Sequence, residues 1–76
     1  MTAKEMFEIE KVKFINETDR YIVYNDGGVI ISFDKKYKTI CFTKEIDTYR
    51  STTDYDADFM VIVAITQQMK ELGWIE

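Results

Sequence analysis

The side chains that could do chemistry in this 76-residue chain are carboxylates and one thiol, because the sequence contains no histidine. Histidine is the usual general base near neutral pH, and the nucleophile schemes that depend on it are therefore unavailable. Cys41 lies inside a predicted strand with no activating neighbour, so we expect a buried, structural cysteine. We predict no cofactor and no metal site, and we expect the protein not to be an enzyme.

The carboxylates gather in one region. Positions 45–58 contain five acids and one base, Arg50, and this region carries the whole net charge of −4. Its end, Asp54 to Asp58, has the D-x-D-x-D spacing that begins a calcium loop. An EF-hand then needs glycine at position six and glutamate at position twelve, where this chain has Phe59 and Ile65. The calcium motif therefore fails, and we interpret at least two of these carboxylates as helix caps.

Aromatic and apolar side chains next to these acids predict a protein-binding surface. Interfaces favour such side chains because they bury much area at low entropic cost. The alternative interpretation is that they are ordinary core and surface residues. The predicted partner-binding residues are Tyr49, Tyr55, Phe59, Met60, Val61 and Val63, with an acidic rim of Glu45, Asp47, Asp54 and Asp56.

The middle of the chain predicts three short strands joined by two tight turns. Asp26-Gly27 is a strong signal for a two-residue hairpin, since Asp-Gly tolerates the positive φ angles of a type I′ turn. A second turn is expected at Lys35-Lys36. Turns centred at these two places pair Ile22 with Ile31, and Ile31 with Ile40.

Both turns place the same apolar side chains on one face of the sheet, because side chains alternate between faces along a strand. A three-residue loop at Asn25 would instead turn one strand over. The sequence alone therefore leaves two choices for the sheet face that stays uncovered. The predicted core face consists of Ile22, Tyr24, Val29, Ile31, Phe33, Ile40 and Phe42.

Helices are expected at both ends of the chain. Thr2 to Glu5 form a capping box that starts the first helix. Gly73 suits the left-handed position after the second helix, where Trp74 would fold back. The apolar residues around 59–63 are also β-prone, so part of this run could form a fifth strand. The stripe expected to cover the sheet consists of Ile62, Ile65, Met69 and Leu72.

The sequence thus predicts one two-layer α+β domain in α-β-β-β-β-α order. Its four-stranded antiparallel meander is covered on one face by the C-terminal helix. The expected bounds are a helix at 3–9, strands at 12–15, 20–25, 29–34 and 38–43, a loop at 44–55 and a helix at 57–72.

Charge and hydropathy exclude other classes of partner. Lys35, Lys36 and Lys38, even with Lys44, are too few to form a groove for nucleic-acid phosphates, so nucleic acid is an unlikely partner. The longest apolar run, Phe59 to Ile65, is far shorter than the ~18 residues of a membrane span. The N-terminus lacks a signal pattern and the cysteine is single, so we expect a cytoplasmic protein.

Four segments of the chain resemble a group of small proteins from phages and mobile elements of Gram-positive bacteria. They are the opening Met1–Phe7, the strand Tyr21–Tyr24, the segment Phe33–Lys38 and the ending Glu71–Trp74. The resemblance implies a phage or prophage protein inside a bacterial host cell, and it implies no activity. The leading hypothesis is a protein-binding accessory module that engages a host or phage protein. The alternatives are a self-contained structural homodimer and, third, a small-ligand binder or enzyme.

Overall fold

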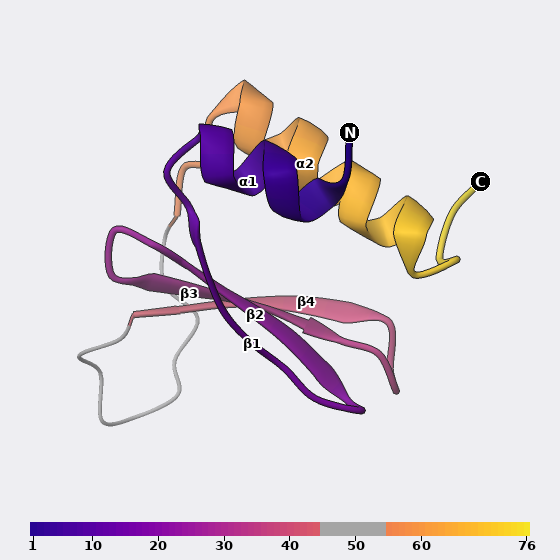
Figure 1. Ribbon diagram of the computed structural model, residues 1–76. Helices are drawn as coiled ribbons and strands as arrows, with labels where there is room; N and C mark the ends of the chain where they lie inside the picture. The colour runs from indigo at the N-terminus through magenta and orange to yellow at the C-terminus, as the bar shows by residue number, and fades with distance from the viewer. Residues whose placement is uncertain (45–54) are drawn as a thin grey trace.

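A four-stranded antiparallel sheet carries both helices on one face in the computed structural model, which describes residues 1–44 and 55–76 (Figure 1). The strands are ordered β1-β2-β3-β4, so each one pairs with its neighbour in the chain. The predicted α+β meander is confirmed, and residues 59–71 form a helix, not a fifth strand. The elements are α1 (Ala3–Ile9), β1 (Lys13–Glu17), β2 (Tyr21–Asp26), β3 (Val29–Asp34), β4 (Thr39–Lys44) and α2 (Phe59–Glu71).

The first hairpin turn is Gly27-Gly28, so its predicted position at Asp26-Gly27 was wrong by one residue. Asp26 is the last residue of β2 and pairs with Val29. Gly27 and Gly28 have φ angles of 58° and 96°, and glycine adopts such angles at no steric cost. The side chain of Asn25 accepts a hydrogen bond from the Gly28 amide at 2.8 Å, which stabilises the turn at this position.

The second turn is also longer than predicted. It contains the four residues 35–38 between the paired Asp34 and Thr39, in place of two residues at Lys35-Lys36. The Asp34 carboxylate accepts hydrogen bonds from the amides of Lys36 at 2.9 Å and Tyr37 at 3.3 Å. These bonds satisfy the turn's backbone locally, as aspartate side chains commonly do.

Both corrections move the strand register by two residues. Ile22 faces Phe33 instead of Ile31, and Ile31 faces Phe42 instead of Ile40. Because side chains alternate with a period of two, a shift of two residues leaves each of them on its predicted face. The predicted core face is therefore confirmed, although the pairs within it differ.

Helix α1 contributes the centre of the core. Phe7 is fully buried, and its ring lies 4.1 Å from the Tyr24 ring and 6.3 Å from the Phe33 ring, centroid to centroid. The prediction placed only the C-terminal helix on the sheet, whereas Figure 1 shows α1 and α2 side by side on the same face. The buried apolar residues are Ala3, Phe7, Val12, Ile22, Tyr24, Ile31, Phe33, Val61, Ala64 and Ile65.

The two helices run antiparallel. The backbone amide of Ala3, at the start of α1, donates a hydrogen bond of 2.7 Å to the carboxylate of Glu71, at the end of α2. Glu71 also accepts a bond of 3.0 Å from the side-chain amide of Gln67. The first amides of a helix have no partner within the helix, and they attract a carboxylate. The Glu71 carboxylate supplies this partner for α1 and thereby joins the two helices.

The buried side of α2 is rotated from the predicted one. The residues that face the sheet are Val61, Ala64, Ile65 and Gln68, at the spacing of one helical face. Ile62, predicted to be in the core, is 48% exposed. A polar residue takes part in this buried face because the Tyr24 hydroxyl donates a buried hydrogen bond of 2.7 Å to Gln68 Oε1.

The predicted end of α2 is confirmed as a Schellman motif. The Trp74 amide donates to the Met69 carbonyl at 2.9 Å, and the Gly73 amide donates to the Lys70 carbonyl at 3.0 Å. Gly73 has the left-handed φ of 76° that this motif requires. The returning chain brings the Trp74 ring to 6.3 Å from the ring of Phe33, at the edge of the core.

Helix α1 ends in the same motif without a glycine. The Val12 amide donates to the Phe7 carbonyl at 2.9 Å, and the Lys11 amide donates to the Glu8 carbonyl at 3.0 Å. Lys11 has a φ of 62°, a left-handed conformation that is unfavourable for residues with a Cβ. This short reversal inserts Val12 into the core directly after the helix.

Replacing Lys11 with glycine is expected to stabilise the protein. The variant Lys11→Gly removes the steric cost of the left-handed conformation, and part of that gain is lost to the greater freedom of glycine in the unfolded chain. We expect the free energy of unfolding to rise by about 0.5–1 kcal/mol in urea titrations. The matched control Lys13→Gly, in β1, should be destabilising. Equal effects of the two substitutions would contradict this account of the helix end.

Removing the Tyr24 hydroxyl is expected to destabilise the fold more than removing both polar partners. Tyr24→Phe leaves the buried Gln68 amide without its donor, which costs about 1–3 kcal/mol. The double variant Tyr24→Phe with Gln68→Leu replaces both partners with apolar groups and should recover much of this loss. Chemical denaturation of the single and double variants measures both values. Additive losses in the double variant would show that the hydrogen bond does not couple the two residues.

Candidate functional site

The side of α2 that points away from the sheet is mostly apolar. We call it the outer face, and its members recur at i, i+3, i+4, i+7 and i+11, which places them on one side of a helix. Phe59 is 72% exposed and Ile62 is 48% exposed. Exposed aromatic and branched side chains on one helix face mark an interaction surface when they are contiguous. The outer face consists of Phe59, Ile62, Val63, Thr66 and Lys70.

Thr66 contributes apolar surface despite its hydroxyl. Its Oγ1 donates a hydrogen bond of 2.9 Å to the carbonyl of Ile62, one turn earlier in the helix. A threonine whose hydroxyl is bonded to its own helix has its polar group already satisfied. The centre of the outer face, from Ile62 to Thr66, therefore needs no polar partner.

The outer face continues toward α1. Met60 is 48% exposed and lies in the first turn of α2. Because the helices are antiparallel, the last turn of α1 lies beside the first turns of α2 (Figure 1). That last turn carries Ile9, which is 62% exposed. Apolar side chains from both helices thus contribute to the same end of the helical layer.

The structure separates the predicted binding residues into three groups. Phe59 and Met60 are exposed at the surface. Val63, on the outer face, is half-buried. Val61 is only 4% exposed and belongs to the core, so its prediction as a surface residue was wrong. The sequence interpretation missed Ile62. The pattern that would have revealed it includes Gln68, because this polar residue lies on the buried face with Val61, Ala64 and Ile65.

Tyr55 attaches the segment before α2 to the sheet. Its hydroxyl donates a hydrogen bond to the Asp26 carboxylate, and its ring lies 5.1 Å from the Phe42 ring. Burial, together with the nearby Asp26 carboxylate, raises the pKa of Tyr55 above its ordinary value. Tyr55 is half-buried and already has its partners. Its position supports a structural role more than the predicted role of a binding anchor.

The remaining predicted residues are only partly described. Asp56 is exposed and precedes α2. Asp58 accepts a hydrogen bond of 2.9 Å from the Phe59 amide, so it caps the helix as expected. The other four predicted residues, Tyr49, Glu45, Asp47 and Asp54, lie outside the described ranges.

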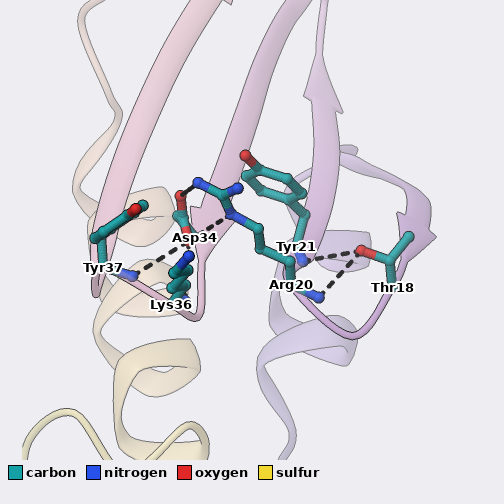
Figure 2. A network of polar contacts seen from close by, with 6 residues as sticks. All are labelled: Thr18, Arg20, Tyr21, Asp34, Lys36 and Tyr37. Carbon is teal, nitrogen blue, oxygen red and sulfur yellow. Dashed lines mark hydrogen bonds and ion pairs between the residues drawn. The ribbon is translucent and has the colours of Figure 1, made fainter.

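A polar network occupies one end of the sheet, at the turns on either side of β2 and β3 (Figure 2). Two nitrogens of Arg20 contact the two carboxylate oxygens of Asp34 at 3.3 and 3.0 Å, and the hydrogen-bonded guanidinium holds the pKa of Asp34 below its ordinary value. The Arg20 guanidinium also lies 5.0 Å from the Tyr21 ring and 5.1 Å from the Tyr37 ring. These groups satisfy one another, so the network fixes the two turns relative to each other.

A shallow depression lies between α1 and β1. Its lining residues are Lys4, Glu8, Lys11, Val12, Lys13 and Phe14. The Lys4 ammonium lies 4.1 Å from the centre of the Phe14 ring, another of the lining residues. All the charged groups here are exposed. Exposed charges of this kind contribute little binding energy in water, so the depression is a weaker candidate than the outer face.

Within the described ranges the possible metal ligands do not cluster, and the single cysteine lies at the surface. No group of three or more metal-ligating side chains occurs within residues 1–44 and 55–76. Cys41 is exposed on β4, where its sulfur lies 3.4 Å from the Thr43 hydroxyl, so the prediction that it is buried was wrong. It lies on the sheet face that neither helix covers. In the same ranges, neither helix is long and apolar enough to span a membrane.

Comparison with known proteins identifies no relative: no family model, no curated protein and no solved structure matches the chain. The resemblance to phage and mobile-element proteins therefore stays a prediction.

Alkaline pH is expected to destabilise the fold through its buried tyrosines. Burial raises the pKa of Tyr24 to about 12, so the folded state retains the phenolic proton more tightly than the unfolded chain. The resulting stability is complete below about pH 10 and is lost as the pH rises through about 12. Urea titrations between about pH 8 and 12, two units on either side of the ordinary tyrosine pKa, measure this loss. Tyr24→Phe should flatten the profile, and an unchanged profile would contradict the assignment.

Tyr55→Phe is expected to lower the free energy of unfolding by about 1 kcal/mol, because it removes the hydrogen bond to Asp26 while the ring keeps its contact with Phe42. The control Tyr37→Phe, at an exposed turn position, should change stability by less than about 0.5 kcal/mol. Thermal or chemical denaturation at neutral pH compares the two. If Tyr55→Phe is as neutral as the control, the hydroxyl does not attach this segment to the sheet.

Proposed function

We propose that this protein is a non-enzymatic protein-binding accessory module that uses the outer face of α2. The observation that carries the proposal is the exposure of Phe59 and Ile62 on a helix whose opposite side already fills the core. Burying one such side chain in a partner contributes about 1.5–3 kcal/mol, so a few of them suffice for a specific contact.

The surroundings of the outer face suit a contact between proteins. Lys70 lies at its C-terminal end, and the exposed Asp56 and Asp58 precede the first turn of α2; an apolar centre with polar surroundings is the common composition of an interface. Helices with an exposed apolar side dock against grooves or against other helices. The resemblance to phage and mobile-element proteins supplies the proposed setting, a factor that acts on a protein in the cytoplasm of a bacterial host.

Photo-cross-linking tests the proposal at single residues. Phe59 is replaced by the photoreactive analogue benzoyl-phenylalanine, and the protein is irradiated in the cell that produces it. We expect the analogue at position 59 to form adducts with a polypeptide. Adding Ile62→Asp should reduce these adducts about tenfold or more, because a carboxylate in the apolar centre opposes docking.

The matched control places the same analogue at Tyr37, which is 61% exposed at the other end of the sheet. Position 37 should yield few adducts if the outer face is the binding surface. Circular dichroism confirms that each variant is folded. Equal adducts from both positions, or none from position 59, would contradict the proposed site.

A further inference from the structure

We infer that the depression between α1 and β1 is a second binding site, which takes a small phosphate monoester with a flat apolar group attached. Its lining residues all lie between Lys4 and Phe14, and none of them belongs to the outer face of α2. The inference therefore goes beyond the proposed function and does not depend on it. It rests on the charge, the apolar wall and the size of the depression.

Three lysines from three consecutive parts of the chain line the depression. Lys4 lies in α1, Lys11 lies in the reversal after the helix, and Lys13 begins β1. Within residues 1–44 and 55–76 none of the three takes part in an ion pair. Their ammonium groups are therefore available to the anionic group of a ligand.

The net charge of the lining matches a phosphate monoester. One acid, Glu8, lines the depression with the three lysines, so the local net charge is +2. The nearby Glu5 does not line it, and its carboxylate accepts hydrogen bonds of 2.9 and 3.0 Å from the amide and hydroxyl of Thr2. A phosphate monoester carries about −1.5 to −2 charges at neutral pH. A carboxylate or a phosphodiester carries one and would leave part of the local charge unmatched.

The apolar wall lies beside these charges. Phe14 is 38% exposed, and the Lys4 ammonium lies 4.1 Å from the centre of its ring. The aliphatic stems of lysines add apolar surface next to their charged ends. An anion bound by Lys4 would thus lie next to an aromatic side chain, which suits a ligand with a phosphate and a flat apolar group.

The size of the depression suits a small molecule. Its volume is about 630 Å³, within the range of about 300–1,000 Å³ that is typical of small-molecule sites. Outside the depression the net charge is −6, because the whole chain has −4. A nucleic acid or an acidic protein would extend over this acidic remainder and be repelled. A single phosphate monoester stays within the positively charged depression.

The backbone at Lys11 supports a role for its side chain. Lys11 has a left-handed φ of 62°, which glycine would adopt more favourably. Unfavourable backbone conformations are concentrated at functional sites, where they keep a side chain in a required position. A glycine here would favour the helix end, whereas the lysine adds a positive charge to the depression.

Titration with adenosine monophosphate, followed by nuclear magnetic resonance of the backbone amides, tests the inference. We expect saturable shifts at Lys4 and at positions 11–14, with a dissociation constant of about 1 mM or below, because exposed charges each contribute little. Cyclic adenosine monophosphate has the same base with a single negative charge, so it should bind about threefold or more weakly. Adenosine without phosphate should leave these amides unshifted, and inorganic phosphate without the base should also bind more weakly.

Three variants separate this site from general effects of charge and stability. Lys11→Gly should bind adenosine monophosphate about two- to fivefold more weakly although it is expected to be the more stable protein. Glu8→Gln removes the opposing carboxylate and should bind about two- to fivefold more tightly, which damage to the fold cannot produce. The matched control is Lys38→Gly, which removes the same charge from an exposed position with a left-handed φ of 55°. It should leave the dissociation constant unchanged.

Four results would overturn the inference. The first is the absence of saturable shifts up to about 10 mM ligand, and the second is shifts confined to residues outside 4–14. The third is equal weakening by Lys11→Gly and Lys38→Gly, which would show that affinity follows net charge alone. The fourth is tighter binding of cyclic adenosine monophosphate, or of a short oligonucleotide without a terminal phosphate, which would assign the depression to phosphodiesters.

Discussion

The buried hydrogen bond between Tyr24 and Gln68 is the contact on which the arrangement of the helical layer depends. A tyrosine hydroxyl in the core must find a partner, and among the described residues Gln68 of α2 supplies it. Satisfying it rotates the helix so that Val61, Ala64 and Ile65 face the sheet with Gln68. That rotation turns Ile62 and Phe59 toward the solvent. The core therefore determines the surface, since the same helix cannot bury both apolar sides against one sheet.

The sheet could be predicted from local chemistry because its constraints repeat every two residues. Both hairpin turns were misplaced, yet every core-face residue from Ile22 to Phe42 kept its side. The errors came from choices between neighbouring turn residues: Gly27-Gly28 replaces Asp26-Gly27, and the Asp34 side chain lengthens the second turn. Such choices depend on hydrogen bonds of single side chains, which hydropathy alone does not describe.

The helical layer was harder to predict because its constraints join distant parts of the chain. Apolar residues lie on both sides of α2, and the buried side is the one where Gln68 accepts the hydrogen bond of Tyr24 in β2. The buried position of Phe7 also depends on contacts between distant parts of the chain, because these contacts hold α1 in place. Helix α1 is seven residues long, too short to be stable alone, and it is held by α2 through Ala3 and Glu71. These contacts lie 44 and 68 residues apart in the chain.

The candidate site follows from the small size of the domain. A chain of this length buries only ~60% of its unfolded surface, and one helix pair on one sheet face uses the apolar residues that the core can accept. Replacing Phe59, Met60 and Ile62 with polar residues would not weaken that core, because these side chains do not reach it. Their exposure on one part of the helical layer is a cost in solubility that packing within the monomer does not explain. A contact with a second polypeptide is the role that we propose for these residues, because such a contact would bury the apolar surface that the core leaves exposed.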